Sequence, residues 1–239
     1  MRRKIGHWLP GTVFWATLGL ITPAPGVAQQ EGQLDGGTFE HSVRSGFAGT
    51  ETFAVRRRGE DIVAVGRVTR EGGPEALQAL EVGLRLDGSG RPLRYELRTR
   101  EGPPLHVVVD RTGSRLRVTT AADEGERFTE FLADDRLVVL EREIAHHYYS
   151  LARRIREAAD PRAVDLEVLV PSEGRTVPLR VRGFARDTLD LQDGRVPSTR
   201  FDLSVGGEVT VLWISTDDGR IMKVAIPGRG WEAARVARP

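Results

Sequence analysis

The sequence has 239 residues, with 35 basic and 34 acidic side chains and no cysteine. A charge balance this close to neutral argues against a general nucleic-acid-binding surface, because such surfaces depend on clustered positive charge. Without cysteine the chain forms neither disulfides nor the acylated cysteine of a lipoprotein. All basic residues except Lys4 and Lys223 are arginines. This bias suits carboxylate recognition, but a GC-rich genome produces it as well.

The first 28 residues have the pattern of a secretory signal peptide. Basic residues at positions 2–4 precede an apolar run at 12–21 and a small-residue segment at 23–28, which is the usual order of such leaders. The apolar run is about half the ~20 residues needed to span a bilayer. We therefore predict cleavage after Ala28 and a soluble mature protein in the periplasm or outside the cell. Cleavage removes the three basic residues at positions 2–4 and so changes the net charge of the chain from +1 to −2.

The mature chain begins with a polar, glycine-rich stretch, and short alternating runs follow it. Residues 29–37 are predicted to be a flexible N-terminal segment, and residues 38–239 a single domain. The first runs, at 38–44, 50–57 and 62–69, alternate between apolar and polar residues as half-buried strands do.

The clearest alternation in the N-terminal half lies at 80–86 and 93–97, around a glycine-rich turn. One face carries leucine, valine and tyrosine, and the other carries arginine and glutamate. Sheets with one wet face are typically antiparallel. Shorter strands are predicted at 105–110, 115–120 and 127–132.

The hydrophobic period changes after residue 134. Apolar residues recur at spacings of three and four over 135–159, which predicts one long amphipathic helix that ends before Asp160 and Pro161. At 1.5 Å per residue such a helix is about 35 Å long and crosses a whole sheet. We expect its apolar face to pack against the apolar face of the sheet.

Strands resume at 164–170, 176–182, 187–191 and 199–205, and a hairpin over 208–226 follows. Gly219 in the segment 216–220 suits the turn. We expect this hairpin to form the closing edge of the sheet, and the tail with Trp231 to leave the sheet. The predicted fold is mainly β (α+β): a curved antiparallel sheet, an incompletely closed barrel of roughly a dozen strands wrapped around one long helix.

An incompletely closed barrel can leave an apolar hollow between the sheet and the helix. The residues that we nominate to line or rim a ligand site in this hollow have large rings or apolar side chains. A packed, dry core is the alternative interpretation of the same face. The nominated residues are His147, Tyr148, Tyr95, Leu97 and Trp213.

The sequence carries no specific catalytic or cofactor signature. Glu143 and His146 have the Glu-x-x-His spacing of di-iron bundles, but such sites need a second pair on a facing helix. Glu143 and His147 are expected to form a surface ion pair at low pH. No Gly-x-Ser-x-Gly motif, cysteine nucleophile or phosphate-binding glycine loop is present. We therefore nominate no catalytic residue, metal ligand or cofactor.

Three segments carry a resemblance to a known group of proteins. The ending at 211–226, the early run Phe47-Ala-Gly49-Thr-Glu51-Thr-Phe53 and the helical pattern at 140–155 resemble a large group of uncharacterised secreted bacterial proteins, classified as a domain of unknown function. The resemblance covers residues 38–235 and implies a half-barrel similar to the Lol-type lipoprotein carriers, with a curved sheet around an apolar hollow. It carries over no functional residue.

Three hypotheses for function follow. The first is a monomeric cell-envelope protein that binds an apolar ligand, a lipid or an acylated partner such as a lipoprotein in the half-barrel hollow. The second is a protein-interaction scaffold with a filled core, which acts through a sheet edge or through the arginine-rich wet face. The third is an envelope hydrolase that uses His146 or His147. None of the three involves nucleic acid or insertion into a membrane.

Overall fold

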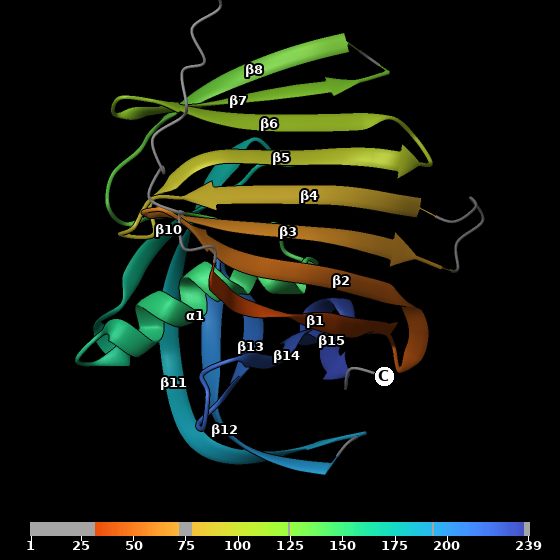
Figure 1. Cartoon of the computed structure of the whole chain (residues 1–239), viewed down its shortest axis with the longest axis vertical. Helices are drawn as coiled ribbons and strands as arrows, with labels where there is room; N and C mark the ends of the chain where they lie inside the picture. The colour runs from red at the N-terminus through yellow and green to blue at the C-terminus, as the bar shows by residue number, and fades with distance from the viewer. Residues whose placement is uncertain (1–31, 72–77, 124, 193, 237–239) are drawn as a thin grey trace, which may run out of the picture.

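The computed structural model describes residues 32–71, 78–123, 125–192 and 194–236. Within them the backbone forms one 15-stranded sheet, which curves strongly without closing into a barrel (Figure 1). The prediction of a mainly β protein with a curved, incompletely closed antiparallel sheet is confirmed, although a dozen strands is too few. The predicted signal peptide, residues 1–28, lies outside the described residues.

The sheet begins and ends with strands from the middle of the chain. Its order is β8-β7-β6-β5-β4-β3-β2-β1-β15-β14-β13-β12-β11-β10-β9. All neighbours are antiparallel except β9 and β10. The first and last strands of the chain, β1 and β15, therefore pair in the centre of the sheet, where Thr38 lies opposite Val236 and Val43 opposite Trp231.

A buried ion pair joins these two central strands. Arg235 on β15 lies 2.9 Å from Asp35 on β1, and the side chains are only 9% and 3% exposed. The prediction that the tail leaves the sheet is wrong, because Trp231 starts β15 and is buried against His41. The 208–226 hairpin is likewise an interior part of the sheet rather than its closing edge, since β14 pairs with β15.

The N-terminal half of the chain forms eight consecutive antiparallel strands. The first begins earlier than predicted: residues 32–37, expected to be flexible, pair with β2, because Asp35 is held by Arg235 and Leu34 packs on the core. The strands are β1 Gly32–Val43, β2 Gly46–Arg58, β3 Asp61–Arg70, β4 Gln78–Leu86, β5 Pro92–Glu101, β6 Leu105–Thr112, β7 Arg115–Ala122 and β8 Gly125–Leu132.

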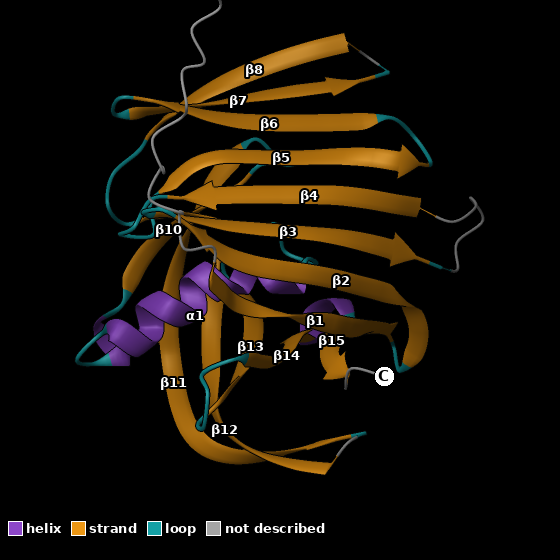
Figure 2. Ribbon diagram, in the orientation of Figure 1, coloured by secondary structure: helices purple, strands orange, loops and turns teal. Residues whose placement is uncertain are grey.

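The predicted helix over 135–159 is wrong in its first half. Leu137–Val139 forms the short strand β9, which pairs in parallel with β10. A 3-10 turn, η1, spans Ala145–His147, and the α-helix α1 spans only Tyr148–Glu157. The apolar residues of the first half are buried as expected. However, the two adjacent valines of β9 favour a strand, and a loop can bury apolar residues at the same spacing as a helix. Figure 2 shows α1 lying beside the curved sheet.

The C-terminal half adds six more strands and two further 3-10 turns. In the predicted hairpin, β13 and β14 flank a turn in which Gly219 has a φ of 72°, as this turn requires. The elements are η2 Pro161–Ala163, β10 Asp165–Val170, β11 Arg175–Leu191, β12 Gly194–Val205, β13 Glu208–Ser215, β14 Ile221–Ile226, η3 Pro227–Arg229 and β15 Trp231–Val236.

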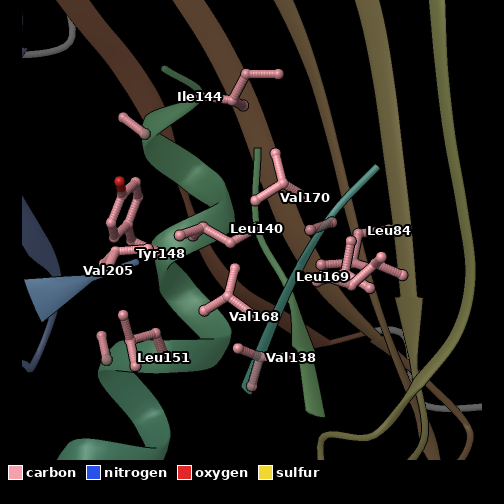
Figure 3. Packing of buried hydrophobic residues seen from close by; sticks show 14 of the residues in the cluster. Leu84, Val138, Leu140, Ile144, Tyr148, Leu151, Val168, Leu169, Val170 and Val205 are labelled. Carbon is pink, nitrogen blue, oxygen red and sulfur yellow. The ribbon is translucent and has the colours of Figure 1, made fainter. Parts of the chain in front are cut away.

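The core lies between α1 with its preceding loop and the inner face of the sheet. One contiguous hydrophobic cluster contains Leu140, Ile144 and Leu151 from the α1 region together with Leu84 and Val168 from strands (Figure 3). All five are at most 2% exposed. Among the described residues, no helix has both the length and the apolar character to cross a bilayer.

Candidate functional site

The residues nominated from sequence divide between the two faces of the sheet. His147, Tyr148 and Tyr95 are 0% exposed and Leu97 is 3% exposed, all in the interior. Tyr148, Tyr95 and Leu97 belong to the contiguous hydrophobic cluster, and the Tyr148 hydroxyl donates to the backbone oxygen of Arg142 at 3.0 Å. The larger hollows in the described part of the chain are lined by other residues.

Trp213 does not join this group, and its placement on the inner face is wrong. The structure turns Trp213 outward, where its indole Nε1 donates to Asp187 at 2.8 Å. The alternate residues Leu212 and Ile214 face the core instead. Both faces of β13 are rich in apolar residues, so the sequence pattern does not distinguish them, and a one-residue change of phase reverses every side chain.

The interior contains a polar cluster that the sequence-based list of site residues lacks. Glu51 on β2 is 0% exposed and lies among His41, His146 and the first residues of η1. Its carboxylate accepts from His146 Nδ1 at 2.8 Å and His41 Nε2 at 3.1 Å. It also accepts from the backbone N–H groups of Ala145 at 2.8 Å and His146 at 2.7 Å. One carboxylate therefore fixes the start of the helical segment to the sheet.

These four donors set the charge of Glu51. Burial acts to raise the pKa of the carboxyl, but the hydrogen bonds from His146 and His41 outweigh it and hold the pKa well below its usual value. The buried carboxylate is thus ionised and fully paired, as a charge in a protein interior must be. The His146 ring also stacks on Phe53, with ring centroids 5.7 Å apart.

His147 lies next to this cluster in a more apolar environment. Its Nδ1 accepts from the backbone N–H of Glu141 at 3.1 Å, and its ring meets Tyr95 edge-on at 5.5 Å. Burial, reinforced by His146, lowers the pKa of His147 well below its usual value, so the ring is neutral. Its Nε2 and the Tyr95 hydroxyl are buried without a hydrogen-bond partner among the described residues.

Glu143 is not a partner of either histidine. It lies 3.6 Å from Arg70 and 3.1 Å from Arg229, so the expected surface ion pair between Glu143 and His147 is wrong. The helix that would have placed them on one face begins only at Tyr148. The described residues contain no group of three or more His, Cys, Asp or Glu side chains arranged to hold a metal ion.

The outer face of strands β2 to β5 carries a broad, open hollow. It has a volume of about 640 Å³ and crosses β2, β3, β4 and β5. Its floor is formed by small or apolar residues, among them Ala54, Gly83 and Val65, whose side chain is 48% exposed. We call this hollow the outer trough. Its volume lies within the range of ligand sites, about 300–1,000 Å³.

Charged side chains line the outer trough. Arginines outnumber carboxylates there: Arg67, Arg98 and Arg100 against Glu81 and Glu96. Glu81 is shared by Arg67 at 3.3 Å and Arg100 at 2.6 Å, and Glu96 accepts from Arg98 at 3.0 Å. The arginines of these pairs are exposed and the glutamates partly so, and each pair therefore contributes little to stability and can exchange its partners.

The sequence contains a pattern from which part of the buried cluster could have been predicted. Glu51 shares the strand phase of Phe53 and Val55, which places an acid on the apolar face of β2. His41 shares the phase of Phe39 on β1 in the same way. A polar residue in a core phase is the informative exception to hydrophobic patterning, whereas its partners in η1 are distant in sequence and emerge only from the fold.

Comparison with known proteins places the fold. No protein-family model matches the sequence, and no curated protein matches it. The chain is similar to the crystal structure of a β-barrel-like protein of domain of unknown function DUF1849 from Brucella abortus, with a TM-score of 0.57 and 10% identity. The similarity covers 86% of this chain and 97% of that chain.

At this identity the similarity shows the fold alone. It supports a β-barrel-like fold, which is the coarser part of the resemblance found in the sequence. The finer parts, the likeness to Lol-type carriers and secretion, stay predictions.

Proposed function

We propose that this protein is a binding protein of the cell envelope that holds an extended, acidic segment of a partner polypeptide in the outer trough. The observation that carries the proposal is the contrast between the two faces of β2 to β5. The inner face is occupied by core side chains, whereas the outer face is hollowed and lined by arginines.

The chemistry of the trough supports this partner class. The floor around Val65 accommodates an apolar side chain, and the guanidinium groups of Arg67, Arg98 and Arg100 suit carboxylates on either side of it. Glu81 and Glu96 occupy these guanidinium groups in the free protein. An acidic segment exchanges one carboxylate for another, so binding leaves no arginine unpaired.

The favoured hypothesis from sequence, an apolar ligand inside the half-barrel, has less support from the geometry. Its nominated lining residues Tyr95, Leu97 and Tyr148 pack within the core cluster. The scaffold hypothesis, with a filled core and an arginine-rich wet face, agrees better with these positions.

The cell-envelope location rests on the leader pattern of residues 2–28. N-terminal sequencing of the protein recovered from its own cells tests it directly. The expected mature terminus is Gln29, and recovery of a chain that starts at Met1 in the cytoplasm would contradict the location.

Site-specific photo-crosslinking tests the partner. A photoreactive residue at position 65, in the floor of the trough, should capture one discrete polypeptide, and mass spectrometry should map the contact to a segment rich in Asp and Glu. A photoreactive residue at the exposed position Arg182 on β11 is the matched control and should not capture it.

Two results contradict the proposal. One is a lipid adduct at position 65, which would favour an apolar or acylated ligand instead. The other is equal capture at positions 65 and 182, which would mean that the trough has no selectivity.

A further inference from the structure

The two edges of the sheet differ in their protection. At one edge β9 has only three residues, all of them buried. At the other edge β8 has eight residues, seven of them exposed, and lies at the top of the view in Figure 1. Long exposed edge strands template pairing with another chain, and proteins normally protect them. In the described residues only β7 pairs with β8.

β8 also carries large apolar side chains that its own fold leaves in solvent. Phe128 is 65% exposed and Leu132 is 73% exposed. The strand contains neither proline nor lysine, two residues that commonly block an edge. Phe128 is held in place by the Arg117 guanidinium, 4.7 Å from the ring centroid.

The free backbone groups of β8 follow from its pairing with β7. The N–H of Ala133 donates to the carbonyl of Ser114 at 2.8 Å, so residue 133 points its backbone groups toward β7. In an antiparallel ladder this direction alternates along the strand. The backbone groups of Glu126, Phe128, Glu130 and Leu132 therefore point away from β7.

We propose that β8 pairs with β8 of a second copy of this chain, antiparallel and with Thr129 on the two-fold axis. Glu126 then faces Leu132 of the second copy, and Phe128 faces Glu130. These pairs use the free backbone groups on both strands and form about eight hydrogen bonds. On the other face, Arg127 lies opposite Phe131 of the second copy.

Charge selects this register. A two-fold axis perpendicular to the sheet pairs only residues that share a face, so the two neighbouring registers centre on Phe128 and on Glu130. The first places Glu126 directly opposite Glu130 of the second copy, and the second places Glu130 directly opposite Glu130 of the second copy. Like charges in these positions are destabilising. With Thr129 on the axis no like charges are directly opposed. Glu130 also keeps its own arginines, Arg115 at 3.2 Å and Arg117 at 3.5 Å.

The proposal goes beyond the trough and does not depend on it, because the outer trough lies on β2 to β5. It replaces the monomer expected from the sequence with a dimer whose sheet continues through β8. The contact is a narrow one, so we expect association in a concentration-dependent equilibrium rather than a permanent dimer.

Single-cysteine crosslinking tests the register, because the chain has no cysteine of its own. Thr129→Cys places two sulfurs across a non-hydrogen-bonded pair, where β-carbons are about 4.5–5.5 Å apart, and should form a disulfide-linked dimer rapidly under mild oxidation. Phe128→Cys should crosslink at least about tenfold more slowly. Thr119→Cys, on β7 beside Phe128, is the matched control and should not crosslink.

Sedimentation velocity provides a second readout that does not depend on the cysteine variants. The wild-type chain should dimerise with rising concentration. Phe128→Glu, at an exposed position, should raise the dissociation constant at least about tenfold by opposing Glu130 of the second copy, with an unchanged melting temperature. A wild-type chain that stays monomeric, or a disulfide that forms as fast at position 128 or 119 as at 129, would overturn the proposal.

Discussion

The two faces of strands β2 to β5 use charge in opposite ways. On the inner face Glu51 is fully buried and accepts four hydrogen bonds from groups fixed by the fold. On the outer face Glu81 and Glu96 are partly exposed to solvent and paired with exposed arginines. The inner carboxylate cannot lose a partner without a large penalty, while the outer carboxylates exchange partners at little cost.

This difference separates stability from recognition. The inner cluster holds η1 and α1 against the sheet, so changes there should act on folding. The outer trough contributes little to folding, so changes there should act on partner binding. The hydrolase hypothesis makes the opposite prediction for the histidines: loss of an activity with little change in melting temperature.

The largest effect is expected from removal of the inner carboxylate. Glu51→Ala leaves two backbone donors and two imidazoles without their acceptor, and should lower the free energy of unfolding by about 3–5 kcal/mol. Denaturant titration measures it. Glu81→Ala is the outer counterpart and should change stability by less than about 1 kcal/mol. Equal effects at the two positions would contradict the comparison.

Two glycines offer a matched pair across the same two faces. A β-carbon at Gly66 would lie 2.5 Å from Cε1 of His146, whereas one at Gly83 meets nothing within 4 Å. His146 cannot yield, because Glu51 holds its ring. Gly66→Ala should therefore cost about 1–3 kcal/mol, and Gly83→Ala should be neutral or slightly stabilising. Thermal unfolding of both variants decides whether His146 packs against β3 as described.

His147 predicts a dependence of stability on pH. Burial lowers its pKa in the folded state, while the unfolded chain binds a proton near pH 6.5. The folded state therefore loses stability as the pH falls below 6.5, by at most about 1.4 kcal/mol per pH unit. His147→Gln should lose this contribution, so its stability should fall less steeply than that of the wild type between about pH 8 and pH 5. Parallel slopes would mean that His147 is not buried as a neutral ring.

The smallest effect on stability is expected in the trough wall. Arg100→Ala removes an exposed partner of Glu81 and should change the free energy of unfolding by about 0.5 kcal/mol or less. The same change should weaken capture of an acidic partner at position 65. A large loss of stability would assign Arg100 to the fold rather than to recognition.

The sequence predicts the sheet well where one face is clearly wet. The strands at 80–86 and 93–97 appear as β4 and β5, because charged residues fix the phase of both. It predicts the α1 region poorly, because Leu137, Leu140 and Ile144 follow a helical period yet are buried in a strand and loops. The prediction of which face a side chain occupies also fails at Trp213, because its strand, β13, has apolar residues on both faces.

The candidate site is harder to predict than the fold. His147, Tyr148, Tyr95 and Leu97 do reach the interior, but they pack there with other side chains. Glu51 and its partners in η1 are 94 and 95 residues apart in the chain, so only the fold brings them together. The outer trough forms where small residues of four strands lie side by side. Which residues these are depends on the pairing register of the strands, and the sequence alone does not give that register.

The central claim is that the outer trough binds an acidic partner segment while the interior serves the fold. Gly83→Asp tests it most directly, because the new side chain has open space and adds a negative charge to the trough floor. With a photoreactive residue at position 65, the account predicts that this change abolishes capture of the partner while the melting temperature stays within a few degrees of the parent. Undiminished capture by the folded Gly83→Asp variant would contradict the account.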